Sequence, residues 1–206
     1  LANISKLHTE FTTKFDRLDV LLNNAGAIWG RREKTVQGHE MTFGVNHLGY
    51  FMMTKTFLPL LKATEGSRII NTASEAHRLA NLKLNNLNWE NKFYSQWRTY
   101  GNSKLCNILF TRELARNLEG TGITTHCFHP GVVRTRFGSS SGGPMRLFLP
   151  LFRLFMINSR KGATTGLHLA LSKDAATSTG EYWVSSKRNR GNRHARNDSN
   201  ARQLWK

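Results

Sequence analysis

The chain has 206 residues, of which 39% are hydrophobic and 21% are charged, which suits one globular α/β domain and argues against a disulfide-stapled miniprotein or a multidomain assembly. Lys and Arg number 30 against 13 Asp and Glu, a formal net charge of +17. That charge permits binding to anionic membranes, nucleic acid or phosphorylated ligands without choosing among them.

Helix and strand patterns alternate from the start of the chain. Apolar residues recur at steps of three and four through residues 1–15, which predicts a helix with one buried stripe. The run at 18–22 predicts a buried parallel strand, and residues 23–26 supply the turn at its carboxyl end. A long helical stretch at 35–62 then leads into a second strand at 68–72.

The same alternation continues with a helix at 94–118, a strand at 123–128, a helix at 160–171 and a short strand near 182–184. It predicts an α/β fold with a doubly wound, Rossmann-like parallel sheet. In such sheets, ligands bind beyond the carboxyl ends of the strands.

Two segments fall outside the alternation. Residues 145–157 form an apolar, amphipathic stretch that is too short to span a bilayer. Residues 185–206 hold seven basic side chains and one acidic one, and 185–200 is rich in Arg and Asn. We therefore expect one domain over residues 1–184 and a solvated basic tail over 185–206, with a short terminal helix.

The two cysteines, Cys106 and Cys127, offer neither a disulfide framework nor a metal-ligand spacing, so we expect a reducing, cytoplasmic setting. The histidines also lack a paired spacing, and no metal site is expected. The sequence begins at Leu1 rather than Met, and no signal-peptide pattern follows. One interpretation is therefore a fragment.

Candidate chemistry lies near the predicted strand ends. Tyr100 and Lys104 are four residues apart on a predicted helix and share a face, where an ammonium can tune a phenol. At this spacing a packed ring beside a solvated charge is the commoner arrangement. Ser74 follows a strand, where it could bind a substrate oxygen or cap a helix. Asn46 falls inside a predicted helix, and Asn24 to Gly26 could be an ordinary turn or a place where a flat ligand approaches the backbone.

The order of these residues resembles the short-chain dehydrogenase/reductase family, with its N-N-A-G segment, N-S-Y-K tetrad and P-G turn: Asn24-Ala25-Gly26, Asn46, Ser74, Tyr100 with Lys104, and Pro130-Gly131. Segments 45–49, 103–107 and 129–135 are similar to the retinol dehydrogenase-like branch. The resemblance covers residues 1–184.

The resemblance implies an NAD(P)-dependent oxidoreductase. Tyr100 would exchange a proton with the substrate oxygen, and Lys104 would depress the pKa of Tyr100 and bind the nicotinamide ribose. Ser74 would hydrogen-bond the reacting oxygen. Asn46 would hold a water that links Lys104 to solvent.

The resemblance also implies an NADP or NAD site, with NADP slightly favoured. Asn24, Ala25 and Gly26 would line its adenosine side, and Tyr100 and Lys104 would contact the ribose; the residues around the nicotinamide would be Pro130, Gly131, Val133 and Thr135. The family begins with a strand and a glycine-rich turn that no segment here matches. We therefore expect an N-terminally truncated domain that lacks about 60 residues, judged from the size of a mononucleotide-binding half.

The expected substrate is a small lipophilic alcohol or carbonyl, retinol- or steroid-like, because the loop after Thr135 is apolar. Residues 145–157 would cover it, make a peripheral membrane contact, or pack on their own domain or a dimer partner. The resemblance implies a homo-oligomer built on the helices that contain Asn46 and Tyr100. The tail lacks aromatics among its arginines, which argues against nucleic-acid binding.

Three alternatives stay open. A catalytically silent, truncated chain would act only through protein contacts, because loss of part of a parallel sheet exposes strand edges. Residues 100–107 also resemble protochlorophyllide reductase, whose turnover would depend on light. A basic nucleic-acid module would bind DNA with a steep salt dependence.

Overall fold

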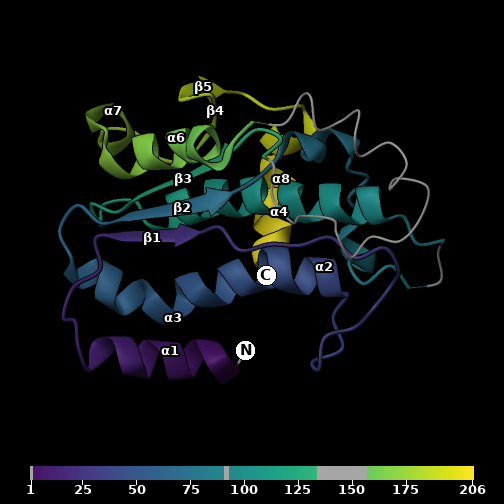
Figure 1. The fold of residues 1–206 in the computed structure, drawn as a ribbon, viewed down its shortest axis with the longest axis horizontal. Coiled ribbons are helices and arrows are strands. Elements are labelled where there is room, and N and C mark those ends of the chain that lie inside the picture. Colours follow the sequence, from purple (N-terminus) through teal and green to yellow (C-terminus); the bar gives the residue numbers. More distant parts are fainter. Residues whose placement is uncertain (1, 91–92, 134–156) are drawn as a thin grey trace.

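One sheet organises the chain, whose computed structural model describes residues 2–90, 93–133 and 157–206 (Figure 1). Within these ranges five strands lie in the order β1-β2-β3-β4-β5. The first four are parallel, and β5 runs antiparallel to β4. Their bounds are β1 (Val20–Asn23), β2 (Arg68–Thr72), β3 (Thr124–His129), β4 (Glu181–Val184) and β5 (Lys187–Asn189). The predicted α/β class and parallel sheet are confirmed.

Helices cover both faces of the sheet (Figure 1). One layer packs around a core that includes Ile69, and it contains α1 (Ala2–Thr12), α3 (Gly49–Ala63) and α4 (Gln96–Asn117). The opposite layer contains α6 (Ser159–Leu171) and α7 (Lys173–Ala176), and its core includes Ile70. Because successive residues of a strand point to opposite faces, these two neighbouring isoleucines serve different cores.

The expected helix at 35–62 begins later than its hydrophobic pattern predicts, with α2 (Met41–Phe43) and the π-helical turn η1 (Gly44–Leu48) preceding α3. Residues 34–40 form a small hairpin closed by Lys34 and Glu40, and Gly38 takes a φ of +86° at its turn. The Glu40 carboxylate accepts hydrogen bonds from the backbone N–H groups of Thr42 and Phe43, at 2.9 and 2.7 Å. This cap sets where the helix starts.

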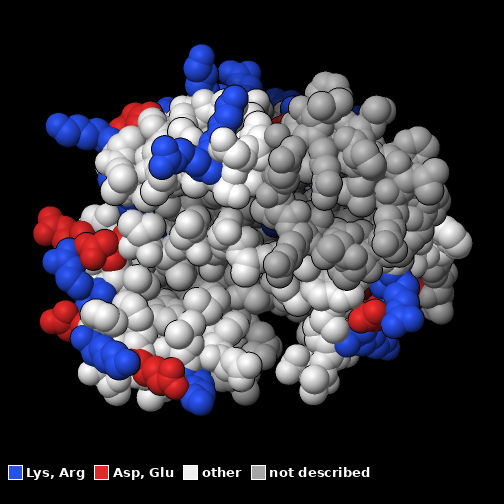
Figure 2. Space-filling model, in the orientation of Figure 1, with Lys and Arg blue, Asp and Glu red and all other residues white. Residues whose placement is uncertain are grey.

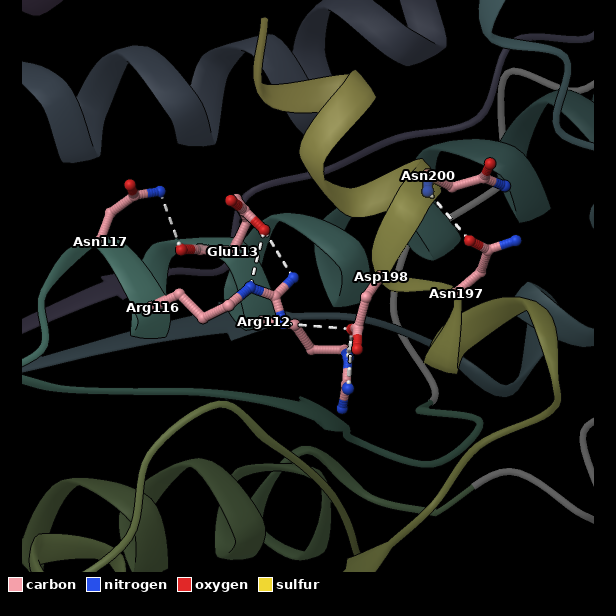
Figure 3. A network of polar contacts seen from close by, with 7 residues as sticks. All are labelled: Arg112, Glu113, Arg116, Asn117, Asn197, Asp198 and Asn200. Carbon is pink, nitrogen blue, oxygen red and sulfur yellow. Dashed lines mark hydrogen bonds and ion pairs between the residues drawn. The ribbon is translucent and has the colours of Figure 1, made fainter.

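The expectation of a solvated tail over 185–200 is wrong, although the predicted terminal helix is present as α8 (Asp198–Trp205). Ordered turns precede it, including η4 (His194–Arg196). Asn192 accepts a hydrogen bond from Ala195 N at 3.0 Å, and Asn197 caps α8 through Asn200 N at 3.0 Å (Figure 3). The asparagines that suggested disorder thus cap and close turns instead.

The C-terminal helix is fixed to α4 by ion pairs and ring contacts. Arg112 and Arg116 both reach the Asp198 carboxylate, at 3.0 and 3.1 Å (Figure 3). The Trp205 ring stacks on Phe110 and meets Phe51 edge-on, with centroids 5.7 Å apart in both cases. Part of the face between α3 and α4, where an oligomer contact was expected, is therefore covered by the chain's own end.

Several expectations lie outside the described residues. Thr135, which was expected beside the nicotinamide, belongs to residues 134–156, as does almost all of the apolar segment 145–157. In the described parts of the chain, no helix combines the length and apolar character needed to cross a bilayer. The space-filling view shows Lys and Arg interspersed with Asp and Glu along the rim of the face that it presents (Figure 2).

Candidate active site

The carboxyl ends of three parallel strands meet at one edge of the sheet. Thr72, the last residue of β2, donates its hydroxyl hydrogen bond to Asn24 Oδ1 at 2.9 Å, which ties the ends of β1 and β2. Ala73 N donates to Phe128 O at 2.8 Å, which ties the ends of β2 and β3. Residues that follow these strands are thereby held close together.

Ser74 faces Tyr100 because the short helix η2 (Glu75–Leu79) packs against α4. A Cβ atom at Gly101 would lie 2.6 Å from Ala76 O, so only glycine allows this approach. Ser74 Oγ accepts a hydrogen bond from Ala76 N at 3.1 Å, and the interaction of its hydroxyl with the Tyr100 phenol acts to lower the pKa of that phenol. The Ser74 hydroxyl therefore caps η2 and also lies beside Tyr100.

Lys104 lies one turn beyond Tyr100 and is only 2% exposed. Its Nζ donates to Thr72 O at 2.9 Å. The same atom lies 5.7 Å from the Tyr100 ring centroid and 5.5 Å from that of Tyr50. The structure thus places the ammonium between two tyrosines, on the face that the four-residue spacing predicts.

Burial dominates the protonation of this pair. It lowers the pKa of Lys104 to about 7 and raises the pKa of Tyr100 to about 12, while the hydrogen bond with Ser74 opposes the second effect. The expectation that Lys104 depresses the pKa of Tyr100 below its ordinary value is therefore wrong for this chain by itself. Tyr100 holds its proton at neutral pH, and Lys104 is poised near its midpoint.

Asn46 is fully buried in the π-helical turn η1. Its side-chain oxygen accepts from Ala27 N and its amide nitrogen donates to Ala27 O, both at 2.8 Å. The same nitrogen donates to Ser103 Oγ at 3.2 Å. Asn46 therefore clamps the loop after β1 to α4, and the π turn displaces it from the regular helical ladder, as such turns often do at functional sites.

The expected cofactor-binding residues gather at the same edge. Asn24 and Ala25 are exposed, and a Cβ atom at Gly26 would lie 2.9 Å from Asn46 Oδ1 and 3.5 Å from Lys104 Nζ. Glycine at this position therefore lets the loop after β1 pack directly against Asn46 and Lys104.

A second turn follows β3 at the same edge. After Pro130, Gly131 takes a φ of +90°, and a Cβ atom there would meet Ile157 at 2.5 Å. Val133 pairs with Ile157 in a short parallel bridge. These contacts hold the turn next to the strand ends, which suits its expected place beside a nicotinamide.

Sequence reasoning missed three residues of this cluster. Tyr50 follows Asn46 by four residues, and its ring faces Lys104. Asn107 follows Lys104 by three residues, and its amide bonds the same Thr72 oxygen. His47, which lies in η1, contacts Asn107 of α4. Helical spacing from Asn46 and Lys104 could have found the first two, because residues three or four apart share a face.

The short chain dehydrogenase family matches residues 1–143. The chain belongs to this family. It is 40% identical to human retinol dehydrogenase 12 over 195 residues, which is 95% of this chain and 61% of that protein. It is 41% identical to mouse retinol dehydrogenase 14 over 209 residues, covering 100% of this chain and 62% of that protein. The predicted resemblance to the retinol dehydrogenase-like branch is confirmed, and the chain spans about three fifths of the length of these relatives.

Solved structures support the fold. The RhlG/NADP active-site complex of Pseudomonas aeruginosa is 25% identical, with a TM-score of 0.67 over 89% of this chain and 70% of that one. An uncharacterized protein of Mycobacterium paratuberculosis is 27% identical, with a TM-score of 0.76 over 99% of this chain and 69% of that one.

Proposed function

We propose that the chain carries the catalytic residues of an NAD(P)-dependent oxidoreductase that interconverts a lipophilic alcohol and its carbonyl. The observation that carries this proposal is the convergence of Ser74, Tyr100 and Lys104, with Ser74 acting on the pKa of the Tyr100 phenol and Lys104 Nζ 5.7 Å from the centroid of the same ring. Family membership supports it, since the tetrad completed by Asn46 stands in the family's order.

Tyr100 is the proton carrier in this proposal. In reduction its phenol gives a proton to the substrate's carbonyl oxygen, and in oxidation it accepts the proton of the alcohol. Ser74 donates a hydrogen bond to the same oxygen and stabilises the charge that develops there. Lys104, held by Thr72 O, supplies positive charge as the phenol loses its proton.

The dinucleotide, when bound, supplies or accepts the hydride at its nicotinamide. Gly26, Lys104 and Gly131 are the described residues proposed to lie beside it, because they stand at the carboxyl edge of the sheet, where ligands of such folds bind. The similar RhlG structure is an NADP complex, which supports NADP for this chain. Asn24, Ala25, Pro130 and Val133 extend the proposed surface on either side.

The substrate proposal rests on the similar proteins, which are retinol dehydrogenases. We propose a retinol-like or steroid-like molecule on that ground. Residues 145–157 are proposed to cover it or to touch a membrane surface, and a cytoplasmic setting is retained as part of the proposal.

The test uses the full 206-residue chain, with NADPH and NADH for the binding measurement and with retinol and NADP⁺ or NAD⁺ as hydride acceptor for turnover. We expect saturable dinucleotide binding by fluorescence, and oxidation of retinol that falls by at least about 100-fold in Tyr100→Phe, since general acid–base catalysis is worth that much. Tyr94→Phe is the matched control, because Tyr94 donates its hydroxyl hydrogen to Glu40 at 3.0 Å, outside the cluster. Full turnover by Tyr100→Phe would refute the proposal.

A second candidate, the catalytically silent chain, is favoured by one observation. β1 lies at the edge of the sheet, and its residue Leu22 is 47% exposed. An apolar edge strand of this kind favours association with another chain. Absence of dinucleotide binding together with concentration-dependent self-association would support this candidate over the enzyme.

A further inference from the structure

Asn107 joins three parts of the site through one amide group. It is fully buried on α4, one turn after Lys104. Its Nδ2 lies 2.9 Å from the main-chain oxygen of Asn46 and 3.1 Å from that of Thr72. The Thr72 oxygen also accepts the hydrogen bond from Lys104 Nζ, at 2.9 Å. The amide therefore connects the π turn, the end of β2 and the buried lysine.

The hydrogen-bond partners of this amide fix its orientation. Main-chain carbonyls only accept, so the two contacts place the NH₂ group of Asn107 on their side and use both of its protons. The amide oxygen then faces His47, whose Nδ1 lies 3.0 Å away. Because that oxygen also only accepts, His47 must carry its proton on Nδ1.

The surroundings keep His47 neutral. The ring is 3% exposed and packs against the rings of Phe43 and Phe110. Burial lowers the pKa of His47 to about 4. Three other titratable side chains, His39, Glu90 and Lys206, share with it the lining of a cavity of about 460 Å³.

Two further titratable groups, Tyr50 and Tyr100, face Lys104 from α3 and α4. Asn107 is uncharged, so it can hold the oxygen that receives Lys104 without altering the charge of the site. A carboxylate or an ammonium at position 107 would alter it.

We propose that Asn107 is a positioning residue for Lys104, and that His47, fixed as its Nδ1–H tautomer, holds the Asn107 amide in the required orientation. Asn107 donates hydrogen bonds to the carbonyls of both Asn46 and Thr72. The Thr72 carbonyl in turn accepts the hydrogen bond that holds Lys104 next to the Tyr100 ring. The role of Asn107 in catalysis rests on the proposed function. The hydrogen bonds among His47, Asn107 and Thr72 can be tested without turnover.

The first experiment reads the tautomer of His47 by ¹⁵N NMR of the full chain, with the signal assigned by its loss in His47→Gln. We expect a neutral ring protonated on Nδ1 from about pH 8 to about pH 5.5, and a change toward the Nε2–H form in Asn107→Leu, which lacks the accepting oxygen. Asn102→Leu is the control: Asn102 is a buried asparagine of the same helix, and its oxygen accepts from Asn81 N. An Nε2–H ring in the unaltered chain overturns the inference.

A second experiment tests the same inference with a different variant and does not require Asn107→Leu to fold. In Asn107→Asp a carboxylate replaces the amide that shares the Thr72 oxygen with Lys104 Nζ. The hydrogen bonds of positions 104 and 107 to Thr72 O, at 2.9 and 3.1 Å, place the two groups within about 6 Å of each other. At an effective dielectric constant near 20, the carboxylate should then raise the lysine pKa by about two or more. The pKa is read from labelled lysine, with the signal assigned in Lys104→Met. Asn102→Asp should give less than half that change, and equal changes in both variants contradict the inference.

Turnover of retinol supplies the catalytic readout. We expect Asn107→Leu to lower kcat on the order of 10- to 100-fold, as misplacement of a catalytic group does, with KM nearly unchanged. His47→Gln can still donate an N–H to Asn107 and should retain more of kcat than His47→Leu. Unaltered NMR results without turnover in any chain refute the proposed function alone. Normal kcat in Asn107→Leu refutes the role of Asn107 alone.

Discussion

The buried lysine should make the stability of the chain depend on pH in a defined window. Burial lowers the pKa of Lys104 from 10.5 to about 7. Between these two values the unfolded chain binds a proton at this residue that the folded chain does not, so the free energy of unfolding rises with pH. The slope is about 1.4 kcal/mol per pH unit, which gives a gain of about 2 kcal/mol from pH 7 to pH 9.

Lys104→Met isolates this effect. The substitution removes the titrating group, and Thr72 O keeps its hydrogen bond from Asn107. Below pH 7 the unaltered chain carries the full cost of charging a buried lysine, on the order of 5 kcal/mol, so the variant should be the more stable one there. Tyr100 does not disturb the window, because its raised pKa of about 12 lowers stability only above pH 10.

The assay is urea unfolding at a series of pH values from about 6 to about 9, followed by circular dichroism, with the m-value checked for constancy. The difference in unfolding free energy between the chain and Lys104→Met should shrink as pH rises. Parallel curves for the two proteins across that range would show that Lys104 titrates as an exposed lysine does, and the reasoning from its burial would fail.

Three further predictions concern neighbouring contacts. Because burial lowers the pKa of His47 to about 4, the chain should lose about 3 kcal/mol of stability as pH falls from 6.5 to 4, and His47→Gln should flatten that loss in acid titrations. Gly101→Ala places a Cβ atom 2.6 Å from Ala76 O, so it should cost about 1–3 kcal/mol in denaturant unfolding and lower kcat by separating Ser74 from Tyr100. Trp205→Ala removes the stacking on Phe110 and should cost about 3 kcal/mol; an unchanged urea midpoint would count against that contact.

Local patterns were sufficient for the regular part of the fold. The spacing of Tyr100 and Lys104 predicted a shared face because helical geometry depends only on neighbours in sequence. The four parallel strands were found because each is a short, largely apolar run, whereas β5 (Lys187–Asn189), which is polar, was assigned to the tail. Their sharing of one edge followed from parallel topology.

The ordered structure at the C-terminus was not predicted, because it depends on contacts between residues far apart in the sequence. Asn192 and Asn197 are typical of disorder by composition, but they accept backbone hydrogen bonds once α8 has a surface to pack on. That surface comes from α4, more than 80 residues earlier in the chain, through Arg112 and its ion pair with Asp198. No pattern within residues 185–206 contains this information, because tertiary contacts supply the stability that the segment lacks alone.

The role of His47 was equally out of reach, because it depends on Asn107, 60 residues away. A histidine inside a predicted helix gives no sign of its tautomer. Only the direction of the two carbonyls that receive the Asn107 amide decides it. The order of the candidate catalytic residues could therefore be predicted from the sequence, but the hydrogen bonds that support them could not.

The opposite shifts of Tyr100 and Lys104 have a common consequence for proton transfer. Burial favours the neutral form of each group, so that near pH 7 Tyr100 keeps its proton and Lys104 is about half protonated. Once Tyr100 loses its proton, an ammonium 5.7 Å from the centroid of its ring attracts the phenolate by about 3 kcal/mol at an effective dielectric constant near 20. Loss of a proton at the phenol thus favours uptake of one at the lysine. The two residues should titrate as a coupled pair, and substitution of either should change the apparent pKa of the other.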